Sequence, residues 1–92
     1  MIDFAKLRQE IPIIEILVWQ GYQLRKSGKT YRAQCQLCSH KSKRAFVVTP
    51  EKGLWYCFNC RNGGDGIEYV SLVGRISKGE AAQLIRNHFK GP

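Results

Sequence analysis

Residues 35–60 read CQLCSHKSKRAFVVTPEKGLWYCFNC and contain all four cysteines of the 92-residue chain. Cys35 and Cys38 form one Cys-x-x-Cys pair, and Cys57 and Cys60 form a second, with 18 residues between the pairs. Such spacing is typical of a zinc site, because two intervening residues let both thiolates of a pair turn toward one ion. The insert is long enough for a β-hairpin that brings the second pair round to complete a tetrahedron. We therefore predict one zinc ion bound by four cysteines.

Two other uses of the cysteines fit the sequence less well. A redox Cys-x-x-Cys motif is usually single and lies at a helix start. Two disulfides need an oxidising compartment, and the chain shows neither a secretory signal nor an apolar run long enough to cross a membrane. We expect a cytoplasmic protein without membrane contact.

The predicted zinc site is closed. Four cysteine ligands leave no position for a water molecule, so the ion is expected to be structural rather than catalytic. His40 is an alternative ligand in place of Cys38, but a separation of two residues strains the chelate, and a supporting or surface position is favoured. Gly63 and Gly64 follow Cys60, and we expect them to let the backbone fold over the site where a Cβ would intrude.

Seven of the Lys and Arg residues are concentrated in one acid-free stretch, residues 25–44, within a chain of net charge +8. They are Arg25, Lys26, Lys29, Arg32, Lys41, Lys43 and Arg44. A focused basic block favours a polyanionic partner, and a solvated surface is the alternative.

Turn and capping signals predict an α+β fold, a small zinc ribbon forming a single domain over residues 1–92. An antiparallel sheet over residues 22–62 carries the cysteines, with turns at residues 27–29 and 50–53. One helix, 12–20, precedes the sheet and ends at Gly21. Two helices, 65–74 and 77–89, follow it, each opening on a capping signature. Their apolar stripes, which include Leu84 and His88 on the second helix, are expected to pack in the core.

Aromatic residues are interleaved with the cysteines and cations: Tyr31, Phe46, Trp55, Tyr56 and Phe58. Single-strand binding proteins combine cations for phosphates with aromatic platforms for bases. Because side chains alternate along a strand, Trp55 and Tyr56 cannot both face the core. Phe46 is expected to share the core with Val48.

Most of the chain resembles the N-terminal zinc-binding domain of bacterial DnaG-type primases. The resemblance is carried, in order, by IPIIEIL, YQLRKSGKTYRAQC, AFVVTPEKGLWYCFNC and NGGDGIEYVSLVGRISKGEAAQLI. It places Cys38 where the family usually has His, which keeps a tetrahedral site, and Gln36 where the family has Pro. It also implies that Trp55 points inward and Tyr56 outward, so we expect Trp55 to pack in the core and Tyr56 to stack on bases.

The resemblance implies a role in priming DNA replication. The expected partners are single-stranded DNA and a primase catalytic domain or subunit, or a replicative helicase, in cis or in trans. The candidate nucleic-acid contacts are Arg25, Lys26, Lys29, Arg32, Lys41, Lys43, Arg44, Tyr56 and Arg61.

The seven acidic residues of the chain are scattered and form no evident paired-carboxylate site, so no catalysis by the chain alone is expected. The alternative is a zinc-stapled adaptor that docks a replication or mobile-element protein through its terminal helices.

Overall fold

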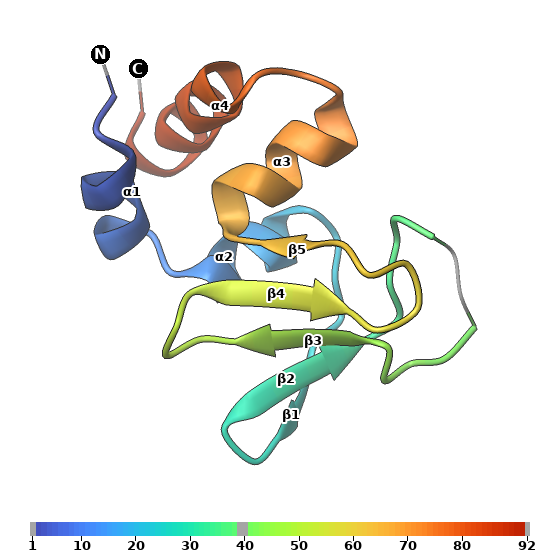
Figure 1. Cartoon of the computed structure of the whole chain (residues 1–92). Helices are drawn as coiled ribbons and strands as arrows, with labels where there is room; N and C mark the ends of the chain where they lie inside the picture. Colours follow the sequence, from blue (N-terminus) through green and yellow to red (C-terminus); the bar gives the residue numbers. More distant parts are fainter. Residues whose placement is uncertain (1, 39–40, 92) are drawn as a thin grey trace.

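The computed structural model of the chain describes residues 2–38 and 41–91, and His40 lies outside this part. The described residues form one antiparallel sheet, with its strands in chain order from β1 to β5, and four helices. The helices gather toward the β5 end of the sheet, and the β1–β2 hairpin projects at the opposite end (Figure 1). The elements are α1 (Phe4–Glu10), α2 (Ile13–Trp19), β1 (Arg25–Ser27), β2 (Thr30–Ala33), β3 (Phe46–Thr49), β4 (Leu54–Cys57), β5 (Gly63–Gly64), α3 (Gly66–Gly74) and α4 (Lys78–Lys90). The predicted α+β zinc ribbon is confirmed.

Two helices precede the sheet, where the sequence predicted one. Asp3 caps α1 by accepting a hydrogen bond from the Lys6 backbone N–H at 3.2 Å. The chain is extended at Ile11 and Pro12 before α2 begins. Only Leu7 of α1 is buried, so the sequence offers no repeating apolar stripe that would have identified this helix.

Glycines form the two hairpin turns of the sheet. Gly28 lies between β1 and β2 with φ +63°, and Gly53 lies between β3 and β4 with φ +65°. This left-handed conformation costs glycine little because it has no Cβ. The turns bring β1 onto β2 and β3 onto β4, and the first cysteine pair lies in the connection from β2 to β3.

An aromatic cluster fills the covered face of the sheet. Phe46 of β3 stacks on Tyr22 at a ring-centroid distance of 4.3 Å and on Trp55 of β4 at 5.4 Å, and the ring of Tyr69 from α3 meets all three edge-on. Trp55 also donates its indole N–H to the Asp65 carbonyl at 2.8 Å. Trp55 is 2% exposed and Tyr56 is 39% exposed, so the expected alternation is present.

The helices enclose a second core. Its buried side chains are Leu7, Ile11, Ile16, Ile67, Val70, Ala81, Ala82 and Ile85. Two residues of the predicted α4 stripe do not belong to it: Leu84 is half exposed, and His88 is an exposed residue whose ring stacks on Trp19 at 4.4 Å. The stripe is displaced because Ala82 and the partly buried Phe89 take the inward positions.

The glycine pair after the second Cys-x-x-Cys pair (the second zinc knuckle, Cys57 and Cys60) has a different role from the one expected. Gly63 and Gly64 form β5, which pairs with β4. A Cβ on Gly63 would lie 2.8 Å from Tyr56 Cδ1 and 2.9 Å from the Trp55 carbonyl oxygen, and one on Gly64 would lie 2.7 Å from Glu68 Cβ. The close neighbours are therefore β4 and α3, not the cysteines.

None of the described helices is long and apolar enough to cross a membrane.

Candidate metal centre and nucleic-acid interface

The four cysteine sulfurs converge at one point between the β2–β3 connection and the end of β4. The Sγ atoms of Cys35 and Cys60 are 4.0 Å apart, those of Cys38 and Cys57 are 3.7 Å apart, and all four lie within 4.8 Å of one another. Zinc bound by four thiolates at about 2.3 Å requires sulfur separations of about 3.8 Å. The four sulfurs thus fit one tetrahedral zinc ion.

N–H donors surround the sulfurs. The backbone N–H of Leu37 points to Cys35 Sγ, and that of Cys60 points to Cys57 Sγ, each at 3.4 Å. Side-chain amides add to this: Asn59 donates to Cys38 Sγ at 3.4 Å, and Asn62 donates to Cys60 Sγ at 3.6 Å. Such donors stabilise the thiolate form that binds a metal and fix the direction of each ligand.

Burial makes this cluster dependent on a cation. Cys35 and Cys57 are at most 1% exposed. Burial raises the pKa of the Cys35 thiol to about 12, because an uncompensated thiolate is poorly solvated there. Zinc therefore has to displace protons when it binds, and its binding free energy becomes folding free energy. Since all four ligands come from the protein, the ion has no open position.

Gln36 anchors the first zinc knuckle, formed by Cys35 and Cys38, to the rest of the domain. Its backbone N–H donates to the Tyr22 hydroxyl at 3.1 Å, and its side-chain amide donates to the Gly21 carbonyl at 3.1 Å. The Tyr22 hydroxyl also accepts a hydrogen bond from Tyr69 of α3 at 2.8 Å. A proline in place of Gln36 could make neither bond from this position, because it has no N–H.

The open face of the sheet carries a row of side chains from four strands. Arg25 of β1 lies opposite Arg32 of β2, which lies opposite Val47 of β3, which lies opposite Tyr56 of β4. Residues paired across antiparallel strands point to the same face. The sheet therefore brings two of the predicted cations onto the same face as the predicted stacking residue.

An aromatic pair stands at the β4 end of this row. Tyr56 and Phe58 meet edge to face at 5.1 Å, and Phe58 is 64% exposed. They border an apolar groove of about 510 Å³ whose other walls include Val47, Leu54 and Gly63. The sequence singled out Tyr56 alone. The exposure of Phe58 follows from its place in the second knuckle, where its backbone N–H is held by the Ala45 carbonyl.

The other predicted cations lie outside this row of side chains. Lys26 is one residue out of step with Arg25 and pairs with Tyr31, so it points to the opposite side of the sheet. Lys29 is exposed in the β1–β2 turn. The remaining cations are exposed beside the metal centre: Lys41, Lys43 and Arg44 before β3, and Arg61 after the second knuckle.

The described residues form three ion pairs, and all of them involve cations of the helices. Arg8 pairs with Asp65, Lys78 with Glu68, and Lys90 with Glu10. None of the described ion pairs uses a cation from residues 25–44. The basic block therefore keeps its positive potential unneutralised within the described part of the chain.

Comparison with known proteins supports a zinc-binding role for the four cysteines. The family model described as the CHC2 zinc finger, the zinc ribbon of DnaG, matches residues 2–90.

This chain belongs to the CHC2 zinc-finger family of DnaG-type DNA primases.

The relatives of known name are DNA primases of which this chain spans less than a fifth. The chain is 39% identical over 80 residues to a DNA primase of Aquifex aeolicus and 36% identical over 85 residues to one of Helicobacter pylori. These matches cover 87% and 91% of this chain but 16% and 15% of the two relatives. A crystal structure of the Aquifex aeolicus primase, comprising zinc-binding and RNA polymerase domains, superposes with a TM-score of 0.81 and 35% identity over 94% of this chain and 21% of that one. The chain is thus a primase-type zinc-binding domain.

Proposed function

We propose that this CHC2 zinc finger binds single-stranded DNA template during primer synthesis. It acts beside a catalytic primase domain or subunit, or a replicative helicase, in cis or in trans. Its zinc ion shapes the binding surface and takes no part in nucleotide joining, and the domain alone is not an enzyme.

The exposed pair of Tyr56 and Phe58 on the open face is the observation that carries the proposal. Two exposed aromatic rings beside an apolar groove offer a stacking surface for unpaired bases. Stacking on an aromatic side chain contributes about 1–3 kcal/mol per base and tolerates any sequence. Bases in a duplex are already stacked, so this surface favours a single strand.

The cations of the basic block suit the phosphates of the same strand. Arg32 and Arg25 continue the row that begins at Tyr56, and neighbouring strands are about 4.8 Å apart. A strand whose bases stack at the β4 end can therefore lay its backbone across β2 and β1. Lys41, Lys43 and Arg44 add positive charge where the connection from the first knuckle reaches β3.

The acidic residues give no support for catalysis by this domain. In the part of the chain that the structure describes, the four cysteines are the only group of three or more His, Cys, Asp or Glu side chains arranged to hold a metal ion. Three of the carboxylates, Glu10, Asp65 and Glu68, are paired with cations of the helices.

A protein-docking role is the second candidate, and exposed apolar side chains on the helices favour it. Leu72 and Val73 of α3 and Leu84 of α4 are each 44–50% exposed. Apolar side chains grouped on a surface can mark contact sites for another protein. In that case the basic block would be dispensable for function.

Fluorescence anisotropy with labelled single-stranded DNA at two salt concentrations tests the proposal. The zinc-loaded chain should bind weakly and with strong salt dependence. If about four of the cations meet phosphates, log K should fall with log salt with a slope near −3. Replacing Lys41, Lys43 and Arg44 together by Ala should weaken binding and flatten the slope. Replacing Tyr56 and Phe58 by Ala should weaken binding without changing the slope.

A charge-matched control separates specific contacts from net charge. The triple variant Lys6→Ala, Arg75→Ala, Arg86→Ala removes the same number of cations from the helical side of the molecule. It should bind nearly as well as the unmodified chain. Equal losses in the two triple variants, or no binding by any protein, would contradict the proposal and favour the docking role.

A further inference from the structure

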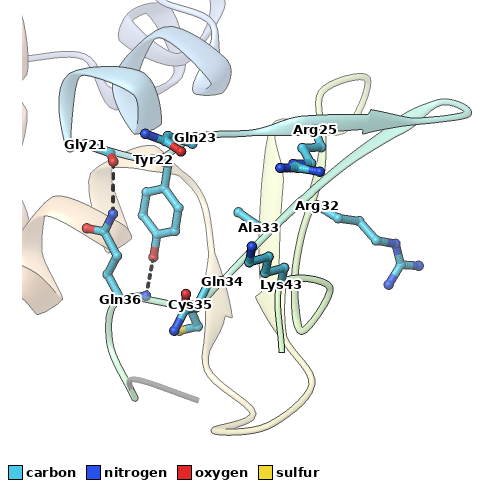
Figure 2. A pocket seen from close by; sticks show the side chains of 10 residues that line it. All are labelled: Gly21, Tyr22, Gln23, Arg25, Arg32, Ala33, Gln34, Cys35, Gln36 and Lys43. Atoms are coloured by element: carbon cyan, nitrogen blue, oxygen red, sulfur yellow. Dashed lines mark hydrogen bonds between the residues drawn. The ribbon is translucent and has the colours of Figure 1, made fainter. Parts of the chain in front are cut away.

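A basic hollow lies beside the metal centre, away from the aromatic groove. Its volume is about 470 Å³, within the usual range of about 300–1,000 Å³ for small-ligand sites. Its lining includes three cations, Arg25, Arg32 and Lys43, and three amides, Gln23, Gln34 and Gln36 (Figure 2). None of the described residues that line the hollow is acidic.

The cations of this hollow form no ion pair with an acidic residue in the described part of the chain. Arg25 and Arg32 are directly paired across β1 and β2, and like charges in that position destabilise a sheet. One nitrogen of Arg32, Nε, is buried and has no hydrogen-bond partner among the described residues. An unsatisfied buried donor also costs free energy. A bound anion would offset the repulsion between the two arginines, whereas the buried Nε is not exposed to the hollow.

The walls of the hollow are fixed in place by hydrogen bonds. Arg32 Nη1 donates to the Arg44 carbonyl at 3.0 Å, which ties the segment carrying Lys43 to β2. On the other side, Gln36 is anchored to Gly21 and to the Tyr22 hydroxyl, as the dashed lines in Figure 2 show. The segment carrying Lys43 is thus held close to Arg32, and this concentration of positive charge favours a ligand with several linked negative groups.

The linings of the two cavities indicate different ligands. The aromatic groove is largely apolar and suits bases, whereas the hollow offers cations and neutral amides. The Tyr22 ring is stacked on Phe46 inside the core, so it is not free to stack on a base. A phosphodiester carries one negative charge, but a terminal triphosphate concentrates several within a few ångströms.

We propose that the hollow of Arg25, Arg32 and Lys43 binds the 5′-triphosphate group of a ribonucleotide. The inference rests on the proposed function, since it assigns three of the proposed phosphate contacts to one particular group. The triphosphate can belong to a free nucleotide or to the 5′ end of a short RNA.

The test is a titration of the zinc-loaded, ¹⁵N-labelled chain followed by amide chemical shifts, with Mg²⁺ present. The ligands are ATP, ADP, AMP and inorganic tripolyphosphate, and a short RNA bearing either a 5′-triphosphate or a 5′-hydroxyl. Affinity should fall from tri- to di- to monophosphate, with the largest shifts at Gln23, Arg25 and Lys43. Tripolyphosphate should bind about as well as ATP. A response to ATP alone would assign the site to free nucleotides, and a response to the triphosphorylated RNA as well would extend it to strand ends.

The double variant Arg25→Gln, Lys43→Gln should bind ATP at least about tenfold more weakly, because it loses two charged groups that can donate hydrogen bonds to phosphate oxygens. Its melting temperature without ligand should be equal or higher, since the Arg25–Arg32 repulsion is relieved, so lost binding would not reflect misfolding. The double variant Lys6→Gln, Arg86→Gln, which removes two charges from the helical side of the molecule, should retain ATP binding.

Shifts as strong at Lys6 and Arg86 as at the hollow would overturn the inference in favour of diffuse polyanion binding. Equal losses of ATP binding in the two double variants would do the same. A failure of the proposed function would give a different result. In that case single-stranded DNA would not bind in a way that depends on Tyr56, whatever the response to triphosphates.

Discussion

The Tyr69 hydroxyl donates a hydrogen bond of 2.8 Å to the Tyr22 hydroxyl, which also accepts the backbone N–H of Gln36. This buried contact joins α3 to the first zinc knuckle, two parts of the chain that are far apart in sequence. The metal centre is therefore coupled to the helical core through side-chain hydroxyls as well as through the sheet.

Replacing Tyr22 by Phe should destabilise the domain more than replacing Tyr69 by Phe. The first change removes the acceptor of two hydrogen bonds and leaves one buried and one partly buried donor unsatisfied, at up to about 1–3 kcal/mol each. The second removes one donor and should cost about 0.5–1.5 kcal/mol. Chemical denaturation of the zinc-loaded variants measures both values, and equal losses would show that the Gln36 bond contributes nothing.

Alkaline pH should unfold the protein through this pair. Burial raises the pKa of Tyr22 and of Tyr69 above the ordinary value of 10.0. In the unfolded chain both hydroxyls ionise near pH 10, so above that pH the unfolded state binds fewer protons than the folded state. Stability should be fully present below about pH 10 and should fall as the pH rises further. Near-UV circular dichroism against pH follows the transition.

The double variant Tyr22→Phe, Tyr69→Phe is the control for this pH effect. It should be less stable at neutral pH but should lose less stability between neutral and alkaline conditions. An unchanged pH dependence would assign the alkaline transition to other groups.

Removing zinc should unfold the sheet. The cysteines are buried at one point, and structural zinc sites in finger peptides contribute about 10–16 kcal/mol of apparent binding free energy. Chelation should abolish the cooperative thermal transition, and added zinc should restore it. Cys57→Ser should behave like the chelated protein, whereas Cys38→His should retain one zinc per chain, because imidazole is also a tetrahedral zinc ligand. Zinc content and circular dichroism together distinguish the two variants.

Gly63→Ala should displace the Tyr56 ring and destabilise β5. The added Cβ would lie 2.8 Å from Tyr56 Cδ1 and 2.9 Å from the Trp55 carbonyl oxygen, and the latter is backbone that cannot move cheaply. We expect a loss of about 1–3 kcal/mol and altered Tyr56 ring resonances. In Gly79→Ala the nearest atom is Ser77 Oγ at 3.8 Å. This helical control should gain about 0.5–1 kcal/mol.

Arg61→Gly should stabilise the fold while weakening DNA binding. Arg61 has φ +60°, a left-handed conformation in which an L side chain costs about 1–2 kcal/mol. Glycine relieves this strain but removes a proposed phosphate contact, so the salt slope should become shallower by about 0.7. Arg61→Lys should keep both the strain and the binding. A glycine variant with unchanged DNA affinity would remove Arg61 from the interface.

The metal centre and the strand pairing could be read from local sequence because their signals are local. The spacing of two cysteine pairs gives the ligand set directly. Gly28 and Gly53 mark the turns, and side-chain alternation separates Trp55 from Tyr56. The capping box of Ser77 and Glu80 is formed by residues three apart. In each case the determining residues are neighbours in the chain.

Other features depended on contacts between distant segments. Helix α1 has a single buried side chain, Leu7, so no periodic apolar pattern predicted this helix. The displacement of His88 from the core depended on how α4 rotates against Trp19.

The sequence by itself determined the zinc ligands, the hairpins and the basic character of residues 25–44, because spacing, turn residues and charge act locally. Only the tertiary structure decided that Arg25 and Arg32 share a face with Tyr56, that Phe58 is exposed beside it, and that Lys43 and Arg25 line the same hollow. These relations depend on strand register and on the path of the β2–β3 connection, which the packing of the whole domain fixes.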